Sequence, residues 1–260
     1  MITSLHNPKI QQVRKLQAQV KARREAQAFV IEGVRLVEEA LQAGWVAELL
    51  FFTGQLDARG RAVVESFASK GAAVEQVSDG VYKSVSDTAT PQGLLAVLPM
   101  RSLPIPPDAS FLLILDGIRD PGNLGTILRT AAAARVQGVL LSPGSTDAYA
   151  SKVVRAAMGA HFRLPIQTLS WEQIRHTLSA SPVTLQVYLA DAAGGIPYTQ
   201  ADFHRPLALI IGGEAAGAGV EAATLAHERV HIPMPGGSES LNAAVAAGLL
   251  IFEVLRQRGM

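Results

Sequence analysis

Three segments of this sequence carry the polar and glycine residues that could form a ligand site, and each follows an apolar run. The first, Leu112 to Ala133, passes through Asp-Pro-Gly-Asn into a helix that carries Arg129. The second is Leu207 to Gly219, and the third is Val230 to Gly248. A joint of strand, loop and helix is where α/β proteins commonly bind ligands. Three such joints after three apolar strands predict one composite site.

The first joint offers an amide and a permanent cation. Asn123 can cap the helix, and Arg129 follows about two turns later. An arginine here is compatible with the exposed face of an amphipathic helix. The neighbouring Ile127 and Leu128 make the helix apolar on most sides, so Arg129 is also expected to face a cleft or a partner.

The second joint combines close backbone approach with a carboxylate. Gly212 and Gly213 let a ligand come near the main chain. Glu214 then stands at the carboxyl end of a buried strand. It either faces the ligand or favours the start of the next helix, and the two roles are compatible.

The third joint has a stiff, apolar loop before a long helix. Ser240 is a natural N-cap for the helix expected over Leu241–Arg258, and Asn242 lies in its first turn. The preceding loop, residues 232–237, combines apolar residues, prolines and glycines, and can grip a flat ring with backbone groups. The helix is apolar nearly all round, so we expect burial on two sides, including by a second subunit.

Composition limits the other possibilities. The chain has 260 residues, 48% hydrophobic and 17% charged, with a formal net charge of +1. It has no cysteine, which excludes disulfides and thiolate catalysis and fits a reducing cytosol. The sequence shows no secretory signal, membrane-spanning run, Walker motif, dinucleotide fingerprint or histidine spacing typical of a metal site. We therefore expect a cytoplasmic protein without a metal.

A proline-rich segment divides the chain. Residues 99–110 read as a semi-rigid linker between a small α/β domain, residues 1–98, and a domain of alternating strands and helices, residues 111–260. That alternation predicts a mostly parallel sheet covered on both faces. Strands are expected at Phe111–Asp116, Val139–Leu141, Leu185–Ala190, Leu207–Gly212 and Val230–Ile232. Helices are expected near Leu124–Arg135, Ser151–Gly159, Trp171–Leu178, Glu221–Ala226 and Leu241–Arg258.

The first helix, which begins at Asn7-Pro8, is strongly basic. It is a candidate RNA-docking surface or simply a solvated face. Its basic residues are Lys9, Arg14, Lys15, Lys21, Arg23 and Arg24.

Three motifs in order and spacing give a resemblance. DPGNLGTILRTA, IIGGEAAGAG and IPMPGGSESLNAAVAAG resemble the signature motifs of the SpoU-type 2′-O-ribose RNA methyltransferases of the SPOUT superfamily. AFVIEGVRLVEEAL and VYKSVSDTATPQGLLAVL are similar to the family's small substrate-binding domain, which has a ribosomal-protein-like fold. The likeness covers nearly the whole chain.

The resemblance implies a catalytic domain with a trefoil knot, S-adenosylmethionine as cofactor, an RNA substrate and a homodimer. It implies catalytic-site positions at Asn123, Arg129, Glu214, Ser240 and Asn242. It implies cofactor contacts at Gly212, Ile232 and Leu241, with Gly213 and Met234 beside them. Ribosomal RNA is favoured as the substrate.

Other interpretations stay open at this point. A tRNA substrate, methylation of a base, and a non-catalytic RNA-binding scaffold with the same fold are the near alternatives. A nucleotide-dependent oxidoreductase is disfavoured because its glycine fingerprint is missing.

Overall fold

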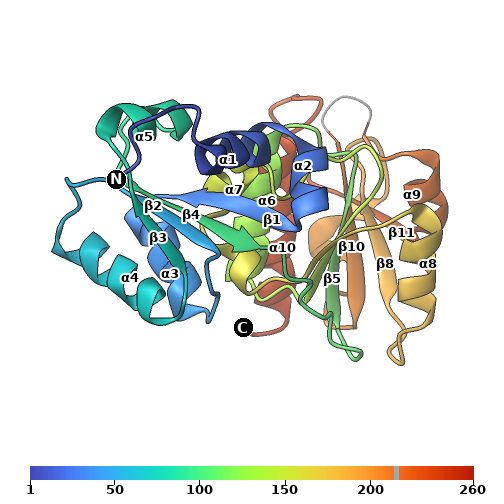
Figure 1. Ribbon diagram of the computed structural model, residues 1–260. Coiled ribbons are helices and arrows are strands. Elements are labelled where there is room, and N and C mark those ends of the chain that lie inside the picture. Colours follow the sequence, from blue (N-terminus) through green and yellow to red (C-terminus); the bar gives the residue numbers. More distant parts are fainter. Residues whose placement is uncertain (214–216) are drawn as a thin grey trace. The chain divides into compact units, whose positions relative to one another are not determined.

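The computed structural model describes residues 1–213 and 217–260, whose contacts divide into two compact units (Figure 1). The N-terminal unit comprises Met1–Arg101 and Tyr149–Phe162, and the C-terminal unit comprises Ser102–Ala148 and Arg163–Met260. This division differs from the expected domains in one segment. Tyr149–Phe162 belongs to the expected domain of residues 111–260, yet Val154 and Phe162 pack into the core of the N-terminal unit.

The N-terminal unit is built on a four-stranded sheet of order β1-β4-β2-β3. Strand β4 is antiparallel to β1 and β2, and β3 is parallel to β2. Its strands are β1 (Ala28–Glu32), β2 (Leu49–Phe52), β3 (Ala73–Gln76) and β4 (Leu94–Pro99). Its helices are α1 (Pro8–Ala18), α2 (Val20–Ala26), α3 (Val34–Gln42), α4 (Ala58–Ser69), α5 (Asp79–Val85), α7 (Ser151–Ala157) and the short η1 (Ala160–Phe162).

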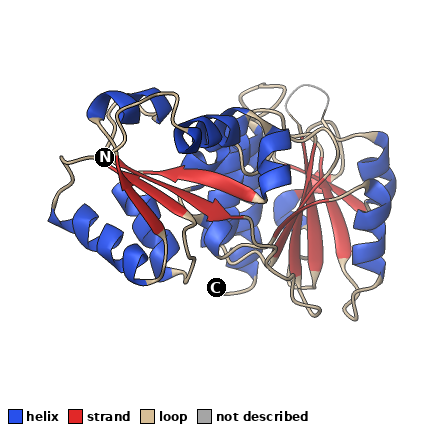
Figure 2. Ribbon diagram, in the orientation of Figure 1, coloured by secondary structure: helices blue, strands red, loops and turns tan. Residues whose placement is uncertain are grey.

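Alternating side chains give this sheet two apolar faces, and Figure 2 shows helices on both sides of its strands. Phe29 and Ile31 of β1 face α3 and α4. Ala28 and Val30, which point the other way, pack with α1 and α5. The period of two along a strand is the physical cause.

The basic segment that we expected to form one helix is two helices. Asn7 caps α1 through a hydrogen bond from the Lys9 amide, with Pro8 in the first turn. Gln19, in extended conformation, separates α1 from α2. The Arg23 guanidinium closes the break, because it donates to the carbonyl oxygens of Leu16 and Gln17 at 2.6 and 3.0 Å.

The C-terminal unit is built on a seven-stranded sheet of order β7-β6-β5-β10-β8-β11-β9, with every neighbouring pair parallel. Its strands are β5 (Phe111–Asp116), β6 (Gly138–Leu141), β7 (Ile166–Thr168), β8 (Gln186–Ala190), β9 (Ile196–Pro197), β10 (Leu207–Gly212) and β11 (Glu228–His231). Its helices are α6 (Pro121–Ala133), α8 (Trp171–Ser179), η2 (Tyr198–Gln200), α9 (Val220–Leu225) and α10 (Ala243–Gln257). The mostly parallel, doubly covered sheet expected from the sequence is confirmed.

Figure 1 shows α8 and α9 on one side of this sheet and α6 and α10 on the other. Leu112 of β5 and Ile210 of β10 share a core with Ile174 of α8. The residues between them, such as Leu113 and Leu209, are also buried and face the opposite side. Burial on both faces explains why these strands are continuous apolar runs.

The elements that our sequence analysis missed are short. Strands β7 and β9 have three and two residues and lie at the two edges of the sheet. The helix α5 has seven residues, and Ser78 caps it by accepting from the Val81 amide. Segments of this length show too little periodicity to be recognised from sequence alone.

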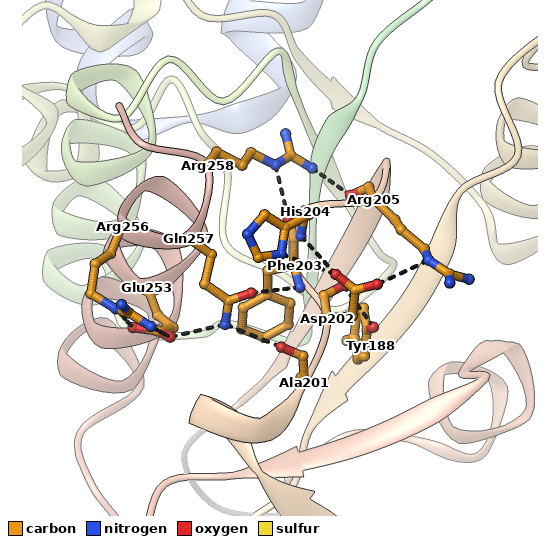
Figure 3. Close-up of polar contacts among 10 residues, drawn as sticks. All are labelled: Tyr188, Ala201, Asp202, Phe203, His204, Arg205, Glu253, Arg256, Gln257 and Arg258. Atoms are coloured by element: carbon orange, nitrogen blue, oxygen red, sulfur yellow. Dashed lines mark hydrogen bonds and ion pairs between the residues drawn. The ribbon is translucent and has the colours of Figure 1, made fainter.

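Polar contacts fix the end of α10 to the loop before β10 (Figure 3). The Arg258 guanidinium donates to the carbonyl oxygens of Phe203, Arg205 and Ser110 at 2.9, 2.6 and 3.0 Å. Burial lowers the pKa of this guanidinium. Gln257 accepts from the Phe203 amide and donates to the Ala201 carbonyl. The last helix is therefore attached to the sheet at its C-terminal end.

Candidate functional site

The three predicted joints lie at one edge of the C-terminal sheet. Strands β5, β10, β8 and β11 are parallel, so their carboxyl ends point the same way. Gly212 pairs with Asp116, and Ala190 pairs with both Ile211 and Val230. Ligands bind at this end of open parallel sheets.

A cavity of about 560 Å³ opens at this edge. The ends of β8, β10 and β11, the loop before α10 and the first turns of α10 form its wall. The predicted cofactor-binding residues Gly212, Gly213, Ile232, Met234 and Leu241 all line it, as does Ser240. Its volume falls in the range of small-molecule and cofactor pockets.

The glycines of the second joint are required by backbone packing. A Cβ atom on Gly212 would lie 2.4 Å from the Ala218 nitrogen, and one on Gly213 would lie 2.5 Å from the Gly117 oxygen. The Gly217 amide donates to the Gly213 carbonyl at 3.1 Å and closes the loop. Any larger residue at Gly212 or Gly213 would therefore displace the cavity wall. Glu214 lies outside the described residues.

The first and third joints meet through a pair of amides. Asn242 Nδ2 donates to Asn123 Oδ1 at 2.9 Å. Asn242 also accepts from the amides of Ala244 and Val245, so it is the N-cap of α10. Our expectation that Ser240 caps this helix was wrong, because the helix begins at Ala243.

The cap of α6 was also misassigned. Asp120 caps α6 by accepting from the Asn123 amide. The Asn123 side chain is thereby left to contact Asn242 rather than its own helix. In both helices the cap is the residue that directly precedes the first helical residue. Sequence patterns locate a helix start only to within a few residues, so they did not identify these caps.

Arg129 is exposed on α6. Among the described residues, the cavity wall includes neither Arg129 nor Asn123. The exposed face of α10 carries apolar residues: Val245, Leu249 and Phe252 are 51%, 42% and 52% exposed. The helix is therefore not covered all round within one chain, and burial of its second side by another subunit stays a prediction.

Our sequence analysis missed the polar groups that the end of β8, strand β11 and the loop before α10 bring to the cavity. Asp191, Arg229, His231 and Glu239 line it. Asp191 Oδ2 accepts from Arg229 Nη1 at 2.9 Å, and its Oδ1 accepts from the Ala193 amide. The available signal was the run Asp-Ala-Ala-Gly-Gly directly after an apolar strand, which has the same form as the other joints. The cavity thus combines apolar walls, backbone groups and a fixed ion pair, a set suited to a nucleoside with polar ends.

The basic residues of the first two helices differ in their availability. Arg23 is 2% exposed and bonded to the end of α1, so its assignment as an RNA contact was wrong. Lys9 forms an ion pair with Glu75, and Lys21 lies 3.7 Å from Glu25. Lys15 and Arg24 are exposed, and Arg14 is half-buried.

The described residues contain neither a metal-binding cluster nor a membrane-spanning helix. No group of three or more His, Cys, Asp or Glu side chains in residues 1–213 and 217–260 could hold a metal ion. In the same part of the chain, no helix has the length and apolarity needed to cross a bilayer.

Similar proteins share both units. The SpoU rRNA Methylase family profile matches residues 110–252, and an MRM3-like substrate binding domain matches residues 7–96. The chain is 36% identical over 256 residues to the 23S rRNA (guanosine(2553)-2'-O)-methyltransferase RlmP of Bacillus subtilis, covering 97% of this chain and 98% of that protein. It is 35% identical to human mitochondrial rRNA methyltransferase 3, covering 92% of this chain and 70% of that protein.

A solved structure has the same architecture. The crystal structure of the AdoMet-bound rRNA methyltransferase from Sinorhizobium meliloti superposes with a TM-score of 0.88 at 34% identity, covering 98% of this chain and 97% of that chain. Its fold agrees with the C-terminal sheet and N-terminal domain described above. The second and third motifs line one cavity, the first meets the third through Asn123 and Asn242, and both units are matched. This chain belongs to the SpoU rRNA methylase family.

Proposed function

We propose that this protein transfers a methyl group from S-adenosylmethionine to a ribose 2′-hydroxyl of ribosomal RNA. The main support is the cavity of about 560 Å³ at the strand ends, which is lined by every residue that we predicted to bind the cofactor. RlmP of Bacillus subtilis, which matches over nearly the full chain, is named for 23S rRNA, and human mitochondrial rRNA methyltransferase 3 is also named for rRNA. Both names favour rRNA over tRNA as the substrate. The AdoMet-bound structure with the same fold supports the cofactor.

The cavity fits the cofactor by its chemistry. Its apolar walls, including Ile232 and Leu241, suit a flat purine ring, and the Asp191–Arg229 pair offers charged groups to the polar ends. When bound, S-adenosylmethionine supplies an electrophilic sulfonium methyl group. The protein then has to hold the ribose oxygen in line with it, and such positioning is worth about 7–11 kcal/mol.

We assign Asn123 and Asn242 to holding the ribose or Arg129 by hydrogen bonds. Their mutual contact fixes both side chains at the junction of two loops. Arg129 acts as a cation, because a guanidinium does not lose its proton in proteins. Its role is to orient the nucleotide phosphate and stabilise developing negative charge on O2′, and one such donor contributes about 3–4 kcal/mol. Ser240 borders the same cavity, and Glu214 is assigned to the second loop by resemblance.

We propose a homodimer formed through α10. Val245, Leu249 and Phe252 recur at helical spacing and leave an apolar stripe on the surface. A second copy of the same helix would cover it, as closed two-fold symmetry allows. The dimer also gives Arg129 a role, since it is exposed on α6, which packs against α10. We propose that Arg129 serves the site of the partner chain.

Mixing two inactive variants tests this arrangement. Arg129→Ala keeps its cavity and lacks the cation, whereas Gly212→Ala keeps the cation and loses the cavity shape. Mixed dimers regain one complete site if Arg129 acts across the interface, so partial activity is expected. No recovery, with dimers verified by mass, would place Arg129 in its own chain's site. Arg175→Ala, an exposed arginine on α8, is the matched control and should retain activity.

We propose that the exposed residues of α1 and α2 contact RNA phosphates, with Lys15 and Arg24 as the central pair. Arg14 and Lys21 lie on the same two helices. Lys9 is assigned a weaker contribution because Glu75 already neutralises it. Phosphate contacts of this kind weaken as salt rises.

We also propose that the C-terminal chain forms the trefoil knot of its family and that the protein works in the cytoplasm. The return of α10 to pack on β10 and α6 supports the first, and the absence of cysteine fits the second. If the two termini are pulled apart, the knot should tighten, and the stretched chain should be shorter than an unknotted chain of 260 residues. A full-length stretched chain would refute the knot.

The main test is transfer of a labelled methyl group to purified ribosomal RNA and transfer RNA, followed by mapping of the product. We expect alkali-resistant, ribose-methylated nucleotides in rRNA and none in tRNA. A methyl group found on a base, or transfer to tRNA alone, would refute the assigned reaction or substrate. Cofactor binding without any transfer would instead favour a non-catalytic scaffold.

A further inference from the structure

Asp116 is a buried carboxylate at the carboxyl end of β5 that lies outside the family motifs assigned above. It is 8% exposed, and both oxygens accept hydrogen bonds from neutral groups. Oδ1 accepts from the Ser142 hydroxyl at 2.6 Å, and Oδ2 accepts from the Gly219 amide at 2.7 Å. Buried polar atoms are destabilising unless they are hydrogen-bonded, and each oxygen of Asp116 has its own donor.

The rotamer of Asp116 is fixed from the side opposite the loop. Ser142 is fully buried and follows β6, the strand next to β5. Its hydroxyl oxygen accepts from the Gly117 amide at 3.2 Å while its proton goes to Asp116. The carboxylate is thus aimed at Gly219 rather than free to turn.

Asp116 holds both ends of the glycine loop that begins at Gly212. At the start of the loop, Gly212 pairs with Asp116 in the sheet. Gly213 next to it lies so close to the Gly117 oxygen that only a glycine fits. At the end of the loop, the Asp116 side chain binds the Gly219 amide. Asp116 on β5 thereby fixes the distance between Gly212 and Gly219, the two ends of this loop.

This loop is part of the cavity wall. Gly212, Gly213, Gly217 and Ala218 line the cavity, whereas Asp116 does not. A change in loop width would move the backbone groups that face a ligand without altering any side chain in the cavity. Hydrogen bonds that fix groups around a site are what keeps its geometry productive.

We infer that Asp116 is a positioning residue for cofactor binding, acting through the Gly219 amide on the glycine loop. The inference rests on the proposed function, because it takes the cavity as the S-adenosylmethionine site. It links the first joint to cofactor affinity, although that joint contributes no residue to the cavity wall.

The test is titration calorimetry with S-adenosylmethionine and with S-adenosylhomocysteine, together with kcat and KM for the methyl donor. Asp116→Ala removes the bond to Gly219, and a lost charged hydrogen bond predicts a dissociation constant raised about tenfold or more. KM for the donor should rise in parallel, with a smaller change in kcat. Asp116→Asn should restore binding to within about threefold, because its amide oxygen can accept from Gly219. The Ser142 hydroxyl can then turn to the Pro143 carbonyl, 3.3 Å away.

Arg258→Ala is the control for destabilisation alone. It removes the clamp at the far end of α10 and should lower the melting temperature while leaving the dissociation constant unchanged. Should Asp116→Ala fail to fold, Asp116→Ser keeps a hydroxyl for Ser142 but is too short to reach Gly219, and the same rise is expected.

The outcomes separate the two proposals. Asp116→Ala with a lower melting temperature and unchanged cofactor affinity would overturn the positioning role. Equal loss of affinity in Asp116→Asn and Asp116→Ala would also overturn it, because an acceptor for Gly219 would then be irrelevant. A wild-type protein that binds neither S-adenosylmethionine nor S-adenosylhomocysteine would instead refute the proposed function.

Discussion

Asn242 performs two functions with one side chain, and a pair of substitutions separates them. Its oxygen accepts from the amides of Ala244 and Val245 at 2.9 and 3.2 Å and caps α10. Its nitrogen donates to Asn123 across 119 positions of sequence. Asn242→Ala loses both functions. Asn242→Ser keeps the cap, because serine is a good N-cap residue, but it is too short to reach Asn123.

The two contacts have different expected magnitudes. Loss of an N-cap costs about 1 kcal/mol of stability, and a neutral hydrogen bond contributes about 0.5–1.5 kcal/mol. Asn242→Ala should therefore lower the free energy of unfolding by about 2 kcal/mol, and Asn242→Ser by about 1 kcal/mol. The effect on catalysis should be equal in the two variants, since both free Asn123 from its partner. We expect kcat to fall about 100-fold in each, as for loss of one donor at a reacting centre.

Single-turnover methyl transfer and urea unfolding of the same preparations provide the assay. A double-mutant cycle with Asn123→Ala completes it, and residues that act as a unit should show no further loss in the double variant. Near-normal turnover in Asn242→Ser beside a large loss in Asn242→Ala would refute the reasoning. The contact with Asn123 would then be incidental and capping would be the sole role.

Three other predictions concern regions away from the cavity. Arg24→Ala should lower the slope of log affinity for RNA against log salt by about 0.7–0.9, as for one lost phosphate contact, whereas Arg23→Gln should lower the melting temperature and leave that slope unchanged. An unchanged slope in Arg24→Ala would argue against RNA contact there. Leu249→Arg should give monomers in sedimentation runs, with methyl transfer lost and cofactor binding kept; a stable dimer would exclude α10 as the interface. The hydrogen bond from Arg256, opposed by burial, lowers the pKa of Glu253 from its ordinary value of 4.5. Ionised Glu253 therefore stabilises the folded state above that value, and this contribution is lost as pH falls through the lower folded-state pKa. Glu253→Gln should lower the free energy of unfolding at pH 7 by about 1 kcal/mol or less, because Arg256 is largely exposed. Urea unfolding at several pH values should also show a smaller loss of stability on the acid side. An unaltered pH dependence would contradict this.

Local sequence patterns indicated where the chain could hold a ligand. Apolar runs ended by glycine, proline, asparagine and aspartate are local signals, and each of the three recognised joints lies at the carboxyl ends of parallel strands. Gly212, Gly213, Ile232, Met234 and Leu241 were found this way and by resemblance, and all line one cavity. Local patterns suffice here because a strand end and a helix start are set by neighbouring residues.

Tertiary structure alone decided which of these groups act together. Because β10 lies between β5 and β8, the second joint reaches the third across a cavity while the first joint contacts both from the side. Arg23 and Arg24 are adjacent in sequence, yet one is buried at a helix end and the other is exposed. Strand order and burial depend on contacts between distant residues, and no local pattern contains them. For the same reason Asp116, which looks like the last residue of a strand, emerges as an anchor for a loop 103 residues away.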